Sequence, residues 1–310
     1  MRFTFHSDPQ IPDSVRPPVI ITGMHRSGTT LLTTLLSRLG LFVGAETDGH
    51  VESLFFQRLN EWMLQSCDGA WDRPEPFIDL LDQETPRSLT VSHLRYILSS
   101  PRARHYAGWR AYLRHGGTGL ATPWGWKDPR STITLPLWLE LFPDAKVIHI
   151  KRHGVDVARS LKKRADAGTA FFESRYHGLR DNYGFLYWLR RKQGGFSGST
   201  RCATLNGGLA LWDTYVTQGV RVIEAHRSTH GDRSDEDRVR AVEYESFLHQ
   251  PASILRELVE FCGLSAEDDK IREASANVNP SRAFAYRSTS ELADFAQRHS
   301  DVLERHGYEP

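Results

Sequence analysis

The chain has 310 residues, of which 39% are hydrophobic and 25% are charged, so it can bury a large core and suits one α/β domain with insertions. Its 39 basic and 38 acidic residues give a formal net charge of +1, which excludes a global field that attracts nucleic acid or anionic membrane. Its three cysteines lack C-x-x-C spacing, which disfavours a disulfide framework or a structural zinc site and favours a reducing compartment.

Residues 1–17 are predicted to form an N-terminal extension. They are polar and contain prolines but lack the apolar core of a signal peptide, and nowhere in the chain do about 18 uncharged apolar residues run together. We therefore expect a cytoplasmic protein with no membrane partner.

The first predicted unit is a strand, a glycine-rich loop and a helix. The apolar run Val19–Thr22 reads as a buried strand, and leucines at helical spacing follow from Leu31 to Leu39. Between them, the sequence Gly-Met-His-Arg-Ser-Gly-Thr-Thr has the frame of a P-loop, with Thr29 in place of the lysine. Loop N–H groups and a helix N-terminus bind phosphate. We therefore expect an anion cradle, without metal, formed by Arg26, Ser27, Gly28, Thr29 and Thr30.

The middle of the chain predicts two further helices and a short strand. A helix is predicted to begin near Glu52, and another around residues 91–113, separated by an irregular segment over 68–90 that is rich in Pro, Asp and Gly. Residues 124–127 read as a short strand that Pro129 ends, before a helix over about 135–141.

A second strand-loop-helix unit is predicted from residue 146. The strand Lys146–Lys151 runs into Arg152, and Ser160 and Arg164 lie one turn apart on the helix that follows. Two guanidinium groups and a hydroxyl suit a second phosphate. Because the neighbouring residues are also basic, an ordinary solvated helix is the alternative.

Residues 165–206 form an insertion rich in Gly, Arg and aromatic residues, read either as a lid or as an amphipathic helical cover of the core. A helix over 205–226, a strand over 239–244 and a helix over 251–262 follow. Strands that alternate with helices predict a three-layer α/β/α fold, P-loop-like, with a mostly parallel central sheet and this aromatic-rich helical insertion. We expect residues 1–310 to form a single domain.

This order of motifs resembles the sulfotransferases that use 3′-phosphoadenosine 5′-phosphosulfate (PAPS), closest to the branch of tyrosylprotein and bacterial sulfotransferases. The resemblance covers about residues 19–263. It rests on Arg-Ser-Gly-Thr-Thr-Leu-Leu after one strand and Arg152-x₇-Ser160 after a later one. It implies that the cradle residues bind the 5′-phosphosulfate and that Arg152, Ser160 and Arg164 bind the 3′-phosphate.

Two later segments extend the resemblance. The run from Val242 to Leu248 with Pro251 is similar to the family's R-Y-E-D-L-x-x-x-P passage, which implies that Tyr244 borders the adenine, although Val242 replaces the usual basic residue. The terminal Asn-Pro-Ser-Arg resembles the loop that closes over the nucleotide, which implies contacts from Ser281 and Arg282.

Sulfuryl transfer requires a base for the acceptor and a cation for the bridging oxygen. Lys127, in Trp-Lys-Asp-Pro, resembles the family's lysine for that oxygen, with an ordinary salt bridge as the alternative. Two sequence segments are candidates to supply the base. Gly-Ala-Glu-Thr, with Glu46, resembles the tyrosylprotein branch, whereas Gly-His-Val-Glu, with Glu52, resembles bacterial relatives and is favoured. His50 is a third candidate because its ordinary pKa lies near neutrality.

The sequence thus predicts an enzyme that transfers sulfuryl in line from PAPS to a hydroxyl acceptor, which is a small molecule, carbohydrate or peptide, and releases 3′-phosphoadenosine 5′-phosphate (PAP) without metal. It does not indicate the acceptor or the oligomeric state. One alternative is a P-loop kinase, disfavoured by Thr29 and by the lack of a clear Walker-B acid. The other is a nucleotide-binding module without catalysis.

Overall fold

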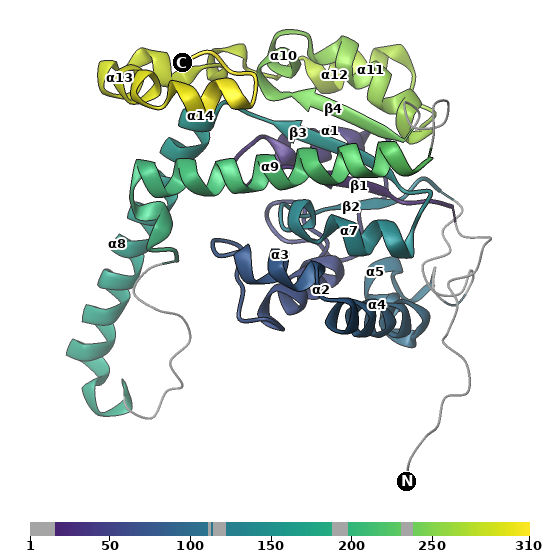
Figure 1. The fold of residues 1–310 in the computed structure, drawn as a ribbon, viewed down its shortest axis with the longest axis horizontal. Coiled ribbons are helices and arrows are strands. Elements are labelled where there is room, and N and C mark those ends of the chain that lie inside the picture. The colour runs from purple at the N-terminus through teal and green to yellow at the C-terminus, as the bar shows by residue number, and fades with distance from the viewer. Residues whose placement is uncertain (1–15, 111–112, 114–121, 188–197, 231–237) are drawn as a thin grey trace. The chain divides into compact units, whose positions relative to one another are not determined.

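The computed structural model describes residues 16–110, 113, 122–187, 198–230 and 238–310 (Figure 1). The predicted extension at 1–17 lies almost entirely outside the described residues, as does part of the insertion, 188–197. The strands are β1 (Val19–Thr22), β2 (Gly125–Lys127), β3 (Lys146–Lys151) and β4 (Val239–Glu243). The helices are α1 (Thr29–Arg38), α2 (Leu54–Gln65), α3 (Glu75–Leu81), α4 (Glu84–Ser99), α5 (Arg104–Ala107), α7 (Ser131–Leu141), α8 (Gly154–Tyr187), α9 (Leu205–His230), α10 (Tyr244–His249), α11 (Pro251–Cys262), α12 (Asp268–Ser275), α13 (Ser290–Arg298) and α14 (Ser300–Arg305). Short 3-10 helices include η3 (Pro280–Arg282) and η4 (Ala285–Ser288).

The chain divides into two compact units. The first contains residues 1–151 and 215–283, and the second contains residues 152–214 and 284–310. The expectation of a single domain stays a prediction. In the described part of the chain, no helix has the length and apolar character needed to cross a membrane.

The sheet of the first unit has four parallel strands in the order β2-β1-β3-β4. Val19 of β1 pairs with Gly125 on one side and Lys146 on the other, and β3 continues to β4. The predicted parallel sheet is therefore confirmed. Because the strands run the same way, their carboxyl ends lie at one edge, where ligands of such sheets bind.

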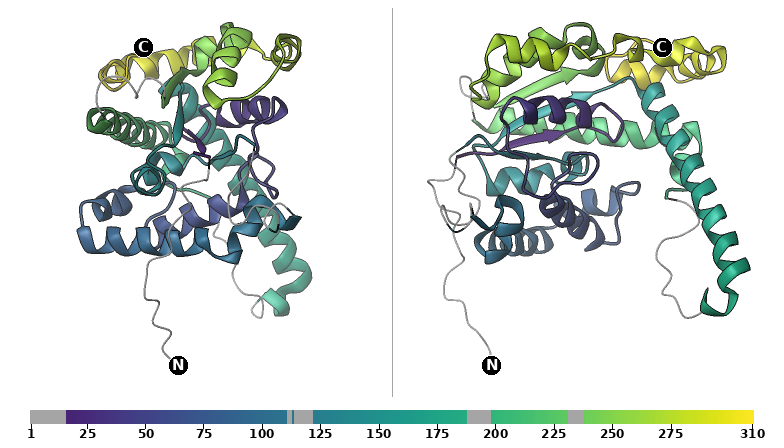
Figure 2. Two further views of the ribbon diagram at one scale, coloured as in Figure 1. Left: turned by 90° about the vertical axis from the view of Figure 1, so that its right-hand side faces the viewer. Right: turned by 180° about the vertical axis from the view of Figure 1, so that it is seen from behind.

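Helices cover both faces of this sheet. On one face, α1, α11 and α12 pack against buried apolar side chains of β1 and β3 such as Ile21 and Ile148. On the other face lie α7 and the part of α9 after residue 215. α9 packs closely against β3, since a Cβ added to Gly219 of α9 would lie only 2.5 Å from the ring of His149 of β3. Figures 1 and 2 show α1 and α9 on opposite sides of β1 and β3. The predicted three-layer fold is confirmed.

The prediction of irregular structure over 68–90 was wrong, because α3 and the first half of α4 lie there. Pro76 and Pro86 suggested breaks, but each lies in the first turn of its helix. Proline is tolerated there because the first N–H groups of a helix have no partner within it. The buried residues Phe77 and Leu80 show that α3 belongs to the core.

The second unit is mainly helical. Its longest element is α8, a continuous helix that includes the described start of the insertion. The ring of His153 stacks on that of Tyr286 with centroids 4.1 Å apart, and a Cβ on Gly154 would lie 2.8 Å from Trp212. The role of residues 165–206 as a lid or a cover stays a prediction.

Candidate functional site

The loop between β1 and α1 has the backbone of an anion cradle. Three of its residues have positive φ, namely Gly23 at 141°, Arg26 at 72° and Gly28 at 94°. Alternation between left-handed and right-handed residues turns successive N–H groups toward one side, which makes a concave anion site. Gly28 is the N-cap of α1 and no side chain caps that helix. The first N–H groups of α1 therefore have no partner within the helix, and the positive end of its dipole faces the loop.

Two observations test whether this loop suits a phosphate group. The Ser27 hydroxyl is buried and has no hydrogen-bond partner among the described residues, so it is available to a ligand at the cradle. The ring of Tyr244 lies so close to Gly28 that a Cβ there would be 2.3 Å from it. Only glycine therefore permits this packing, and the residues present fit a bound phosphate.

A buried ion pair adjoins the cradle. Lys127 is 1% exposed and ends β2, and its Nζ lies 2.9 Å from Oε1 of Glu52. The same ammonium group donates to the Thr30 hydroxyl at 3.3 Å. A buried ammonium group needs such partners, because removal from water without compensation is costly. The structure thus brings together one candidate base, the candidate lysine and the first turn of α1.

Aromatic and polar contacts fix the distance between α2 and β2. The ring of Phe56 stacks on Trp126 with centroids 3.8 Å apart and planes 7° apart. One turn later, Asn60 donates to Asp128 at 2.9 Å. Because these residues adjoin the Glu52 segment and Lys127, the ion pair is held by a packed framework.

The three candidate bases differ in burial. Glu52 is 6% exposed, whereas the side chains of Glu46 and His50 are exposed. Of the three, Glu52 alone contacts Lys127 in the described part of the structure. The site residues remain predictions, but this geometry favours Glu52.

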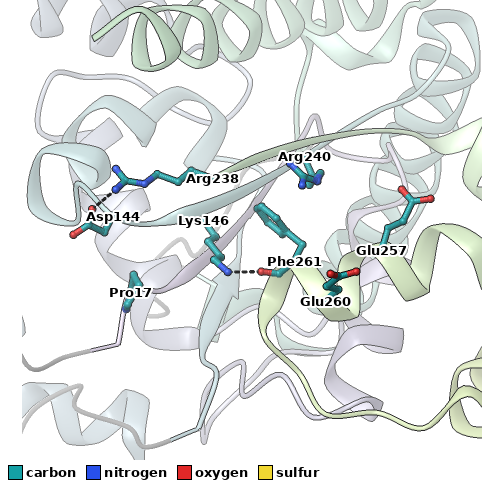
Figure 3. A pocket seen from close by; sticks show the side chains of 8 residues that line it. All are labelled: Pro17, Asp144, Lys146, Arg238, Arg240, Glu257, Glu260 and Phe261. Carbon is teal, nitrogen blue, oxygen red and sulfur yellow. Dashed lines mark hydrogen bonds and ion pairs between the residues drawn. The ribbon is translucent and has the colours of Figure 1, made fainter. Parts of the chain in front are cut away.

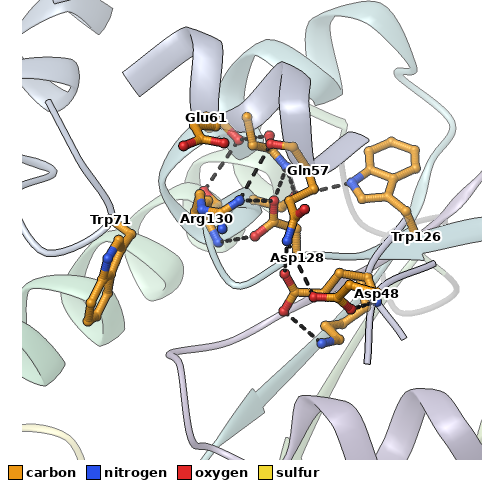
Figure 4. A network of polar contacts seen from close by, with 12 residues as sticks. Asp48, Gln57, Glu61, Trp71, Trp126, Asp128 and Arg130 are labelled. Carbon is orange, nitrogen blue, oxygen red and sulfur yellow. Dashed lines mark hydrogen bonds and ion pairs between the residues drawn. The ribbon is translucent and has the colours of Figure 1, made fainter. Parts of the chain in front are cut away.

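Asp128 and Arg130 extend the polar network beside the ion pair (Figure 4). Arg130 Nη1 lies 3.3 Å from Asp128 Oδ2, and its backbone N–H donates to Oδ1 at 2.9 Å. Burial raises the pKa of Asp128 to about 6, with Arg130 opposing this shift and Glu52 adding to it. Asp128 is therefore an acid whose charge is costly inside the protein.

The residues predicted to bind the second phosphate lie in the second unit. Arg152 Nη2 lies 3.4 Å from Asp156 Oδ2, which also accepts the Ala285 N–H at 3.1 Å. Burial raises the pKa of Asp156, and Arg152 opposes this shift. Ser160 is half-buried and Arg164 is exposed.

Three further candidates lie in the first unit. Tyr244 begins α10 and is 4% exposed, with its ring against Gly28. Ser281 and Arg282 are exposed in η3, where the Ser281 hydroxyl donates to Asn279 at 2.8 Å. Their roles toward the nucleotide stay predictions.

A cavity of about 720 Å³ lies at the amino ends of the strands, away from the cradle (Figure 3). Within it, Arg238 pairs with Asp144 at 2.7 Å and Lys146 donates to the carbonyl of Phe261 at 2.6 Å. Both cations are therefore already paired within the protein.

In the described residues no group of three or more His, Cys, Asp or Glu could hold a metal ion, and the expected metal-free reaction stays a prediction.

Sequence reasoning missed three side chains around the cradle and Glu52. The Gly23 N–H donates to the Thr132 hydroxyl at 2.9 Å, which anchors the start of the loop. Gln57 Nε2 donates to Glu52 Oε2 at 2.9 Å, and Asp48 Oδ1 accepts the N–H of Glu52 at 2.8 Å. The spacing of Asp48 and Gln57 from Glu52 was the available signal, but the structure of this loop was not predicted.

Comparison with known proteins gives a family match over more than half of the chain. Residues 17–196 match the model of the sulfotransferase family. The cradle, Glu52, Lys127, Arg152 and Ser160 all lie within the matched residues.

One curated relative is an uncharacterised protein of Aquifex aeolicus (strain VF5), 23% identical over 281 residues. The match covers 88% of this chain but 30% of that protein, so this chain spans about a third of its relative's length. Among solved structures, the sulfotransferase domain of the Synechococcus PCC 7002 olefin synthase is 18% identical, covers 97% of this chain and 98% of that one, and has a TM-score of 0.49. A mouse sulfotransferase complexed with PAP is 14% identical, covers 90% and 68%, and has a TM-score of 0.41.

Proposed function

Because the chain belongs to the sulfotransferase family, we propose that it transfers a sulfuryl group in line from PAPS to a hydroxyl acceptor and releases PAP. The observation that carries this proposal is the buried Lys127–Glu52 pair, which also contacts Thr30 at the cradle. A base and a cation beside an anion cradle are the parts that this reaction needs.

Each group of residues in the first unit is assigned a separate role in the reaction. The N–H groups at the start of α1, with the hydroxyls of Ser27 and Thr30, hold the phosphate next to the sulfuryl group. Glu52 accepts the proton of the acceptor hydroxyl as its oxygen bonds to sulfur. Lys127 neutralises the charge that develops on the bridging oxygen as the sulfur–oxygen bond to the phosphate breaks. The donor, when bound, supplies the sulfuryl group.

Other assignments rest on the family resemblance. We assign the 3′-phosphate to Arg152, Ser160 and Arg164, and nucleotide contacts to Tyr244, Ser281 and Arg282. The hydroxyl acceptor belongs to the same proposal, whereas a cytoplasmic location is proposed from the cysteine pattern of the sequence. For residues 165–206 a lid and a helical cover of the core remain the two proposals.

Glu52→Gln tests the role of Glu52. The amide keeps the size of the side chain but cannot take the proton, so turnover should fall by about 10²–10⁴-fold. The measurement is release of PAP from PAPS with 4-nitrophenol, tyrosine or glucose as the hydroxyl compound, and with water alone. Stabilisation by PAP should persist, because the cradle is intact.

Glu46→Gln and His50→Gln complete this comparison. Both side chains are exposed, and we expect wild-type turnover from each variant. Normal turnover in Glu52→Gln, with a loss in Glu46→Gln or His50→Gln, would move the base to that residue. Normal turnover in all three variants would exclude Glu52, Glu46 and His50 as the base.

A further inference from the structure

The Glu52 carboxylate has one donor on each oxygen among the described residues. Lys127 Nζ contacts Oε1 at 2.9 Å, and Gln57 Nε2 contacts Oε2 at 2.9 Å. Lys127 also contacts Thr30 and is assigned to the reaction. Among the described residues, Gln57 is therefore the one side chain that contacts the Glu52 carboxylate without contacting the cradle.

The turn that carries Glu52 is closed by Asp48. Its Oδ1 accepts the backbone N–H of both His50 and Glu52 at 2.8 Å. Between them, Val51 has a φ of 59°, which is unfavourable for a β-branched residue. Such strain persists only where surrounding contacts impose it, and it clusters at functional sites.

Gln57 links this turn to the framework of α2. Its Nε2 also lies 3.5 Å from Asp48 Oδ2, so one neutral amide lies between two carboxylates (Figure 4). Its neighbour Phe56 is stacked on Trp126, and its own carbonyl accepts from Arg130 at 3.4 Å. The amide is thus fixed relative to β2, which carries Lys127.

We propose that Gln57 is a positioning residue that orients the Glu52 carboxylate toward the acceptor hydroxyl. The inference rests on the proposed function, since it takes Glu52 as the base. Lys127 alone leaves the carboxylate free to rotate about its contact at Oε1. The Gln57 amide fixes Oε2 as well, and it carries two N–H groups and no charge. A carboxylate at position 57 would add repulsion, and a thioether would donate nothing.

Gln57→Met tests this role, because methionine has similar volume and no N–H donor. A hydrogen bond to a charged group is strong enough that we expect kcat to fall at least about 10-fold. The assay is PAP release from PAPS with the compounds named above. The KM for PAPS and the thermal stabilisation by PAP should not change, which also shows that the variant folds. Gln65→Met is the matched control, because Gln65 lies on the same helix and its side chain hydrogen-bonds only to Glu61 among the described residues.

A double-mutant comparison separates positioning from a general structural effect. If Gln57 acts through Glu52, then Gln57→Met should cause no further loss in a Glu52→Gln background. The same loss in both backgrounds, or wild-type kcat in Gln57→Met, would overturn the inference while leaving the role of Glu52 intact. Wild-type turnover in Glu52→Gln alone would instead refute the base assignment, and the inference with it.

Discussion

Lys127 shows how one residue links stability and chemistry. Its ammonium group is buried, so a charged partner such as Glu52 is needed whether or not the site is catalytic. An ordinary salt bridge explains the contact with Glu52. The contact with Thr30 adds what such a bridge does not require, because Thr30 belongs to the first turn of α1, next to the anion cradle. This is the physical reason to place Lys127 at the site of transfer.

Asp128 makes a pH-dependent contribution to stability at the residue scale. Burial raises its pKa from 3.8 to about 6 in the folded protein. Between pH 4 and 6 the folded state keeps a proton that the unfolded state has lost, so the free energy of unfolding falls as pH rises through this window. Below that window both states are protonated, and above it the cost is fully present.

We therefore expect the stability of Asp128→Asn relative to wild type to rise between pH 4 and pH 6 and then level off. Asparagine has no charge to lose and can still accept the Arg130 N–H at Oδ1. Urea unfolding of both proteins at pH 4, 5, 6 and 7 measures this difference. A difference that is constant over the series would contradict a raised pKa for Asp128.

At the scale of elements, the β1–loop–α1 unit depends on Gly28. Alanine there would adopt a φ of 94°, and its Cβ would lie 2.3 Å from the Tyr244 ring. We expect Gly28→Ala to lower the free energy of unfolding by more than about 1 kcal/mol and to weaken stabilisation by PAP.

Gly168→Ala is the control for this substitution. Gly168 lies within α8, where the added Cβ would have no neighbour within 4 Å. Alanine is better than glycine inside a helix, so this variant should be about 0.5–1 kcal/mol more stable than wild type. Denaturant unfolding of both variants checks the pair. A Gly28→Ala protein as stable as wild type would show that the loop does not need its left-handed conformation.

The elements also show what the sequence could predict. Three elements were predicted with their observed bounds, namely the strands Val19–Thr22 and Lys146–Lys151 and the helix Pro251–Cys262. Their spacing of apolar residues follows directly from burial within the sheet or on one face of the helix. The prolines of α3 and α4 led to a wrong prediction of irregular structure, because proline is tolerated in the first turn of a helix but disrupts its interior. The spacing of Gln57 from Glu52 was not enough to predict its contact, since that contact depends on a turn closed by Asp48.

At the scale of the whole molecule, the predicted phosphate-binding residues are divided between the two units. The cradle belongs to the first unit, and Arg152, Ser160 and Arg164 belong to the second. The sequence joined the two sets first by their shared phosphate-binding chemistry and then by the resemblance to PAPS-dependent enzymes. A ligand with phosphates at both the 5′ and 3′ positions is therefore the probe that addresses both sets.

We propose that this chain binds a 3′-phosphorylated sulfuryl donor, and thermal unfolding in the presence of nucleotides tests this binding. A ligand that binds only the folded state stabilises it by about 2.7 kcal/mol at 100 times its Kd. We predict that PAP raises Tm more than ADP or ATP does at the same concentration, with no need for magnesium. An equal or larger shift with ADP, or with ATP and magnesium, would contradict the claim and favour a phosphate-transferring P-loop enzyme.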